Sequence, residues 1–221
     1  MWTITLWLAA APAFSFATPL ASPDALSVGK KTSVLMLVHT FGDKSTRPAS
    51  LAVERVGGGV VGQLNDSGAE GDAQAGDGIF AGRFELTPAT RVAIVLRAVA
   101  EIDGQKVASP TVEVAVLPKG APTELSTEPA APVVVNPVTG QQFLADQLIA
   151  CFGAKVPFEE ISKTVGAVQG RLAGRFPLVT NCYQVRLPAT GKASTVLDAI
   201  ARLQKRAGVV SAEVNGIMKG F

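Results

Sequence analysis

The feature that most constrains the fold is the Pro-rich stretch PKGAPTELSTEPAAP, Pro118–Pro132, because it separates two halves with different hydrophobic patterns. It carries four prolines and few large apolar residues, a composition typical of a semi-extended linker. Short β-rich runs with Gly-rich turns precede it, and a mixed strand and helix pattern follows. A chain of 221 residues has the length of one or two domains. We therefore predict two domains, residues 25–117 and 141–221, with residues 118–135 as a linker.

The first half predicts an all-β domain. Its short apolar runs are bounded by turn residues, and Asp103-Gly104 is a typical hairpin turn. We expect strands within TSVLMLVHT, ASLAVERV, GVVGQL, GIFAGRFEL, RVAIVLRAVAEI and KVASPTVEVAVL. About seven such strands in roughly 95 residues indicate an immunoglobulin-like β-sandwich, although the Cys…Trp…Cys pattern of antibody domains is absent.

The second half predicts an α+β domain. DQLIACF, AVQGRLA, CYQVRLP and VVSAEVN have the pattern of strands. Two amphipathic runs have the spacing of helices: PFEEISKTV, with Phe158, Ile161 and Val165 along one face, and TVLDAIARLQKRAG. The order strand–helix–strand–strand–helix–strand is the ferredoxin-like (βαββαβ) plan. The predicted fold class is therefore an all-β immunoglobulin-like sandwich followed by an α+β ferredoxin-like (βαββαβ) domain.

The N-terminus has the pattern of an export signal. WTITLWLAAAPAFSFA is apolar, is short for a membrane span and is interrupted by Pro12. Ser15 and Ala17 are the small residues that a signal peptidase prefers, so we predict that residues 1–17 are a signal peptide. A retained apolar anchor is the alternative, because no Lys or Arg precedes Lys30. The predicted location is secreted or periplasmic, with no membrane association after cleavage.

An acidic, Gly-rich loop lies within LNDSGAEGDAQAGDGIFAGRFEL, Leu64–Leu86. Its carboxylates are hard oxygen ligands of the kind that Ca²⁺ prefers, although their spacing is not that of an EF-hand. These candidate metal ligands are Asp66, Glu70, Asp72 and Asp77. A tight turn in which the Asp side chains bond to their own backbone explains the same residues. Both interpretations stay open, and we otherwise expect no cofactor.

Cys151 and Cys182 are the two cysteines. In the predicted plan we expect the first and third strands of the second domain to be parallel neighbours, with Cys151 near the end of one and Cys182 at the start of the other. That arrangement separates them by roughly 13 Å, beyond the reach of a disulfide. We therefore expect two buried free thiols. A shift in register would permit a disulfide, which an oxidising compartment allows.

The sequence offers little for catalysis. Its single histidine, His39, lies in an apolar run, where a core or edge position is the ordinary interpretation. No phosphate-binding loop of the form GxxxxGK[ST] is present. A net charge of +2 without a Lys/Arg run gives no support to nucleic-acid binding. We predict a protein that is not an enzyme and has no nucleic-acid partner.

Two stretches resemble known families. Within residues 141–221, FLADQLIACFG, EEISKTVGAVQGRLAGRF, CYQVRLP and STVLDAIARLQKRAGVVSAEVN resemble the propeptide domain of subtilisin-type proteases, especially the fervidolysin-like N-terminal prodomain. The acidic loop resembles a turn of bacterial immunoglobulin-like extracellular modules, in which D-x-G-x-x-G-D-x-x-A-G-D-G precedes an aromatic-bearing strand. The first resemblance implies a βαββαβ fold that acts as an intramolecular chaperone and a tight inhibitor of its protease.

The propeptide resemblance also implies a binding site. In that family one sheet face covers two enzyme helices, and the residues after the last strand lie extended in the substrate cleft. The corresponding residues here are Glu213, Asn215, Gly216, Ile217, Met218, Lys219, Gly220 and Phe221. Phe221 would fill the primary specificity pocket, and Glu213 would cap an enzyme helix. Asn215 stands where propeptides often have an acidic residue.

We therefore predict an exported, non-enzymatic protein that binds and inhibits, or chaperones, a subtilisin-type serine protease, with its C-terminal tail in the substrate cleft. The alternative is an extracellular adhesion or assembly module, in which both domains are spacers and the acidic loop binds Ca²⁺. A frayed terminus is the ordinary explanation of the tail.

Overall fold

The computed structural model describes residues 14–216 except residues 44, 46, 130, 131, 178 and 180. The described chain is mostly β, with 46% strand and 11% helix. It divides into two compact units. One unit takes in the described part of residues 1–22 with residues 31–88 and 92–115; the other takes in residues 23–30 and 89–91 with the described part of 116–221.

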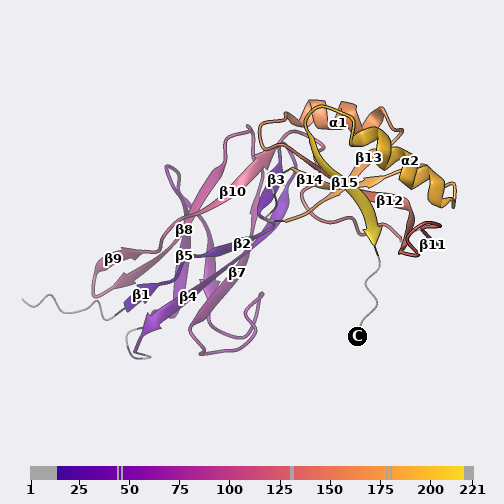
Figure 1. The fold of residues 1–221 in the computed structure, drawn as a ribbon. Helices are drawn as coiled ribbons and strands as arrows, with labels where there is room; N and C mark the ends of the chain where they lie inside the picture. Colours follow the sequence, from indigo (N-terminus) through magenta and orange to yellow (C-terminus); the bar gives the residue numbers. More distant parts are fainter. Residues whose placement is uncertain are drawn as a thin grey trace, which may run out of the picture. The chain divides into compact units, whose positions relative to one another are not determined.

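Ten strands in the first part of the chain form one hydrogen-bonded sheet (Figure 1). These strands are β1 (Phe14–Phe16), β2 (Leu20–Ser22), β3 (Ala25–Ser27), β4 (Thr32–Gly42), β5 (Ser50–Arg55), β6 (Val60–Asn65), β7 (Ile79–Leu86), β8 (Ile94–Ile102), β9 (Gln105–Ala108) and β10 (Val112–Leu117). Their order across the sheet is β1-β4-β7-β6-β5-β8-β10-β3, with β2 beside β4 and β9 beside β8.

Strand β4 buries one face, whereas β7 and β8 each contain three consecutive buried residues. On β4, Val34, Met36 and Val38 are buried while the residues between them are not, the two-residue period of a strand with one covered face. The hairpin predicted between β8 and β9 is confirmed: Ile102 pairs with Gln105, and Asp103 has a positive φ of 50°, as a tight two-residue turn requires.

The second part of the chain forms a five-stranded sheet with two helices. Its elements are β11 (Val133–Val135), β12 (Gln142–Phe152), α1 (Phe158–Gly166), β13 (Arg171–Arg175), β14 (Cys182–Arg186), α2 (Ala193–Leu203) and β15 (Val209–Gly216). Phe143 of β12 pairs with both Gly216 and Val134, so β15 and β11 lie on opposite edges of β12. The pair β14 and β13 continues the sheet on the β11 side.

Both helices cover the same face of this sheet (Figure 1). Ile161 of α1 and Leu203 of α2 are fully buried in one cluster with Leu148 of β12 and Tyr183 of β14. The helices form where the sequence predicts them, because Phe158, Ile161 and Val165 recur at helical spacing and their shared face packs on that cluster.

The predicted fold class is nevertheless wrong. The ten strands of the first half are compatible with the all-β sandwich predicted for it, so the part of the prediction that fails is the second domain. The second sheet has five strands rather than the four of a ferredoxin-like (βαββαβ) domain, because Val133–Val135, from the predicted linker, pairs with β12 as β11. The neighbours β12 and β14, expected to be parallel, are antiparallel.

Two segments have more structure than the sequence predicts. Phe14–Phe16, inside the predicted signal peptide, forms β1 and pairs with the end of β4, and Phe14 is buried. The predicted linker adds β11, and most of it groups with the second unit. None of the helices in the described residues is long and apolar enough to cross a membrane.

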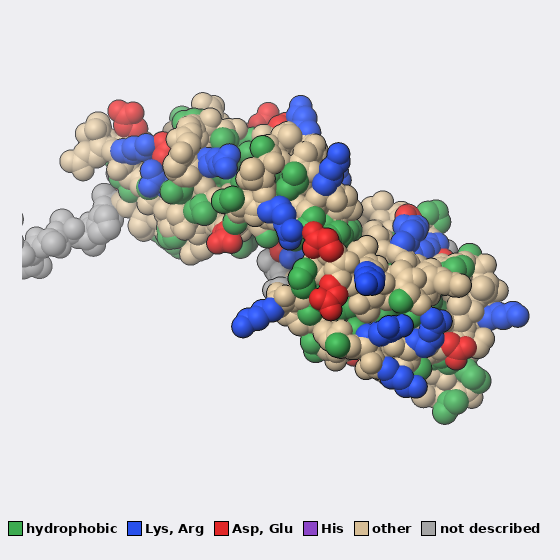
Figure 2. Space-filling view, turned by 90° about the horizontal axis from the view of Figure 1, so that it is seen from above, with side chains coloured by type: hydrophobic (Ala, Val, Ile, Leu, Met, Phe, Trp, Pro, Cys, Tyr) green, Lys and Arg blue, Asp and Glu red, His purple; other side chains and the backbone are tan. Residues whose placement is uncertain are grey.

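Charges of both signs are mixed on the face drawn in Figure 2, where Lys and Arg side chains are spread over both units with Asp and Glu among them. This mixing agrees with the small net charge of +2.

Candidate functional site

The second sheet has a face that points away from the helices, which we call the outer face. Leu148 and Ala150 are buried against the helices, so the alternate residues of β12 point the other way. Directly opposite residues in an antiparallel pair share a face. The outer face therefore carries Gln147, Ile149 and Cys151 on β12, Arg171 and Gly174 on β13, Cys182, Gln184 and Arg186 on β14, and Ser211 and Glu213 on β15.

Cys151 and Cys182 form a disulfide on this face. Their Cα atoms are 4.0 Å apart, because the two residues are directly opposite each other on β12 and β14. The expectation of free thiols is therefore wrong: antiparallel neighbours bring the end of one strand against the start of the other. The bond closes a loop over a sequence separation of 31 that contains α1 and β13, and disulfides persist in oxidising compartments.

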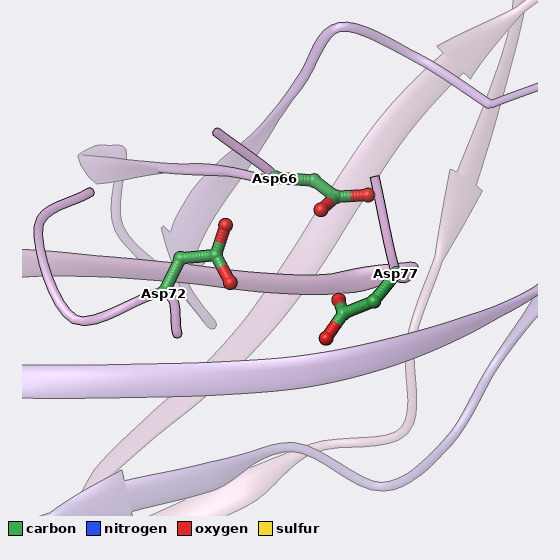
Figure 3. Close-up of side chains that lie close together, drawn as sticks. All are labelled: Asp66, Asp72 and Asp77. Atoms are coloured by element: carbon green, nitrogen blue, oxygen red, sulfur yellow. The ribbon is translucent and has the colours of Figure 1, made fainter. Parts of the chain in front are cut away.

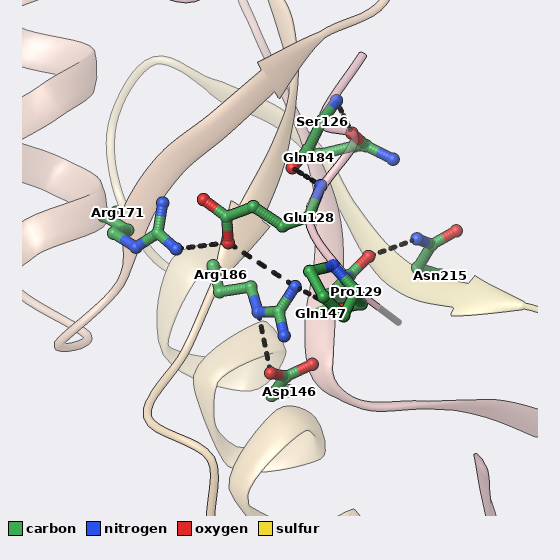
Figure 4. A network of polar contacts seen from close by, with 9 residues as sticks. All are labelled: Ser126, Glu128, Pro129, Asp146, Gln147, Arg171, Gln184, Arg186 and Asn215. Carbon is green, nitrogen blue, oxygen red and sulfur yellow. Dashed lines mark hydrogen bonds and ion pairs between the residues drawn. The ribbon is translucent and has the colours of Figure 1, made fainter. Parts of the chain in front are cut away.

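A segment of the predicted linker covers the β13–β14 half of the outer face. We call this segment, Thr123–Pro129, the strap. Its contacts begin at the edge of the sheet, where the Arg175 N–H donates to the Glu124 carbonyl at 2.7 Å. The Ser126 N–H then donates to the Gln184 side-chain oxygen at 2.7 Å (Figure 4). Arg186 Nη1 donates to the Pro129 carbonyl at 2.9 Å. The strap thus crosses from β13 over β14.

Glu128 is the charged anchor of the strap. Its Oε2 accepts a hydrogen bond from Arg171 Nη2 and lies 3.6 Å from Arg186 Nη1. Arg186 is held in place by Asp146, which is 2% exposed and whose Oδ2 lies 2.7 Å from Arg186 Nε. The hydrogen bond from Arg171, with help from the charges of both guanidinium groups, lowers the pKa of Glu128. The anchor is therefore charged at neutral pH.

The last strand forms the other half of the outer face. Ala212 is 1% exposed and points to the core, whereas Glu213 is exposed on the outer face, as the two-residue period of a strand requires. Asn215 donates from Nδ2 to Gln147 Oε1 at 2.9 Å. Gly216 pairs with Phe143 and ends β15. The other residues of the predicted protease-binding site lie outside the described residues: Ile217, Met218, Lys219, Gly220 and Phe221.

The acidic loop between β6 and β7 brings three of its four predicted ligands together. One carboxylate oxygen from each of Asp66, Asp72 and Asp77 lies within 4.8 Å of the others (Figure 3). Glu70 is not in this group; it occupies a turn position with a φ of 55°. The side chains of Asp66, Asp72 and Asp77 point toward a common space, as the metal interpretation needs.

The same carboxylates are also bound by their own loop. Asp66 accepts from the N–H groups of Gly76 at 2.6 Å and Gly78 at 3.0 Å. Asp72 accepts from the Gly68 N–H at 2.6 Å, and Asp77 Oδ1 accepts from the Ile79 N–H at 2.8 Å. These bonds satisfy the turn interpretation. Carboxylate oxygens have several lone pairs, so the bonds are compatible with a hard cation as a further partner.

His39, the one histidine, is exposed on β4, with its ring centroid 4.5 Å from that of Phe41.

The strap residues are the part of the site that sequence reasoning missed, because their partners Gln184, Arg171 and Arg186 are distant in the chain. Comparison with known sequences adds no family: neither a protein-family model nor a curated protein matches the chain.

Proposed function

We propose that this chain is an exported, non-enzymatic protein that binds and inhibits, or chaperones, a subtilisin-type serine protease through its last strand and the residues after it. The observation that supports this proposal is the position of β15. In the described part of the chain β15 pairs only with β12 and has no strand on its other edge, although the Gln204 side chain donates to the Ala212 carbonyl at 3.1 Å. Extended partner segments bind such edges through main-chain hydrogen bonds.

The side chains around β15 fit contact with a protein partner. Glu213 is exposed, and Val210 is 72% exposed at the start of the strand. The hydrogen bonds and ion pairs of the strap go to β13 and β14, so these contacts do not involve β15. The hydrogen bond from Asn215 to Gln147 supports the end of β15, and a preorganised binding segment loses less entropy when it binds.

The disulfide supports the exported location, since such bonds form in the periplasm and outside the cell. Phe14–Phe16 belongs to the first sheet as β1, so a mature protein that keeps this strand would be cleaved before Phe14 rather than after Ala17. N-terminal sequencing of the exported protein measures this position directly.

Inhibition of a purified subtilisin tests the proposed function. We expect the full chain to inhibit, and a version that ends at Asn215 to inhibit about 100-fold less, because it lacks the segment that would occupy the cleft. The variant Val138→Ser, on an 89% exposed turn between β11 and β12, should inhibit like the parent chain. If the shortened version inhibits equally well, the tail is not the inhibitory segment; if the full chain does not inhibit at about 10 μM, the proposal is wrong.

A second candidate function is an extracellular adhesion or assembly module that Ca²⁺ stabilises. The observation that favours it is the cluster of Asp66, Asp72 and Asp77. A ligand that binds only the folded state at about ten times its dissociation constant adds roughly 1.4 kcal/mol of stability. For a unit of this size we expect Ca²⁺ to raise the melting temperature by about 5–10 °C.

The melting shift is measured with CaCl₂ and then reversed with a chelator. Asp72→Asn should abolish the shift, and Asp103→Asn, the same change in the β8–β9 turn, should retain it. Comparing shifts rather than absolute melting temperatures separates metal binding from the turn bonds that Asp72 makes. An equal shift in both variants would assign the effect to another site.

A further inference from the structure

The strap is held on the outer face mainly by main-chain contacts, which a peptide of unrelated sequence could also make. Two of its main-chain groups, the Glu124 carbonyl and the Ser126 N–H, bond to Arg175 and Gln184. A third, the Pro129 carbonyl, bonds to Arg186. Main-chain hydrogen bonds together with one specific side-chain anchor are the usual means by which a protein binds an extended segment.

At Gly174 the outer face lets the main chain of a bound segment approach the sheet closely. A Cβ atom on Gly174 would overlap the Ser126 nitrogen and would lie 3.0 Å from the Leu125 carbonyl carbon. The bulge between Leu172 and Gly174 on β13 brings this glycine opposite Gln184. Gly174 and Gln184 therefore form a small seat in which a peptide group lies directly against the sheet.

The side chains of the strap point mostly away from this seat. Glu124 and Thr127 are exposed, and Leu125 is 44% exposed. Thr123, at the start of the strap, is 6% exposed, and Glu128 is the charged strap side chain that meets the face, through Arg171 and Arg186 (Figure 4). What the face recognises in the strap is consequently a main chain that bends at Glu124 and Glu128, with one carboxylate placed over two guanidinium groups.

The Glu128 carboxylate can be displaced from Arg171 and Arg186 by another carboxylate, because its ion pairs are weak. The Arg171 side chain is 58% exposed and the Glu128 side chain 41% exposed. Ion pairs with this exposure are weak and are screened by salt. The strap gains its occupancy from being part of the same chain, since tethering supplies an effective concentration in the millimolar range.

We propose that the β13–β14 half of the outer face is a binding site for a carboxylate-bearing main-chain segment of a partner protein, and that the strap is the chain's own ligand for it. A partner binds by placing a carboxylate between Arg171 and Arg186 and a peptide N–H on Gln184, and the strap leaves. The proposal is independent of protease binding, because it involves neither β15 nor the residues after it.

A fluorescent peptide with the strap sequence APTELSTEPA, residues 121–130, is the probe. In the chain, Glu128→Gln removes the internal anchor and leaves the face intact. We expect this variant to bind the peptide about threefold more tightly than the unchanged chain does, because its own strap competes less well. A peptide in which Glu128 is replaced by Gln should bind about threefold more weakly. Glu160→Gln, the same charge change on the first turn of α1 at the helix side, should behave like the unchanged chain.

Hydrogen exchange reports release of the strap separately. The amides of Ser126 and Arg175 are bonded across the contact, and both should exchange faster in the Glu128→Gln variant. Adding Gly174→Ala should release the strap and also prevent peptide binding, because the seat is filled. If the Ser126 and Arg175 amides exchange at the same rate in the Glu128→Gln variant, Glu128 does not hold the strap on the face. Faster exchange without peptide binding below about 1 mM overturns the binding site.

Discussion

Replacing both Cys151 and Cys182 with serine should lower the free energy of unfolding of the second unit by about 3–4 kcal/mol. The disulfide closes a loop over a sequence separation of 31, and in the chain-entropy model a loop of this size restricts the unfolded state by about that amount. For a unit of this size the melting temperature should fall by about 10–20 °C. Exposure of Cys151 is intermediate and Cys182 is buried, so reductant should act slowly on the folded protein.

Tyr183 provides the measurement. It is the only tyrosine in the chain, it is 1% exposed, and it packs in the core of the second unit. Its near-ultraviolet circular dichroism therefore follows the unfolding of that unit. Denaturing the parent chain with reductant should reproduce the melting temperature of the double serine variant, and reductant should leave the variant itself unchanged. A variant as stable as the parent would contradict the loop argument.

Gly82→Ala should destabilise the first unit by about 3 kcal/mol or more, at the upper end of the cost of overpacking. Gly82 lies inside β7, where it pairs with Met36 of β4. A Cβ there would overlap the main-chain oxygen of Gln63 and would lie 3.1 Å from the Gln63 carbonyl carbon. That neighbour is backbone of β6, so it cannot rotate away as a side chain could.

Gly59→Ala is the matched control. A Cβ at Gly59, in the turn between β5 and β6, meets no atom within 4 Å. Urea unfolding followed by far-ultraviolet circular dichroism should show a change of less than about 0.5 kcal/mol for this control. Equal effects of the two substitutions would mean that β6 moves away from β7 without cost, which the close approach at Gly82 argues against.

Local pattern was sufficient to predict most individual elements. The runs rich in Val, Leu and Ile became β4 to β10, and the two amphipathic runs became α1 and α2. These elements depend on side-chain period and turn residues, both of which are visible within a short window. The short strands β1, β2 and β3 escaped detection because three residues are too few to show a period.

The pairing of the strands and the contacts between distant segments were harder to predict than the individual helices and strands. The disulfide was missed because β12 and β14 were expected to run parallel, and one reversed direction changes a separation of roughly 13 Å into a Cα distance of 4.0 Å. The residues Thr123–Pro129 resemble a linker by composition, and their contacts to Arg175, Gln184, Arg171 and Arg186 are what hold them on the sheet. Such long-range contacts leave no signal in a single sequence.

The acidic loop was predicted in part: the sequence identified three residues that converge and one that does not. The spacing of Asp66, Asp72 and Asp77 was enough to select residues that converge, because each caps a turn of the same loop. Glu70 was selected by charge alone, and its position at a turn with positive φ keeps it out of the cluster. Residue type therefore identified the candidates, and backbone geometry decided among them.

The disulfide also sets the mechanical length of the molecule. If the chain is pulled from its ends, the segment between Cys151 and Cys182, which contains α1 and β13, cannot straighten even after every strand has separated. A separation of 31 residues corresponds to roughly 100 Å of extended chain. Under tension the oxidised protein therefore acts as a shorter tether than the reduced one, and a reducing agent would lengthen it by that amount without any change in sequence.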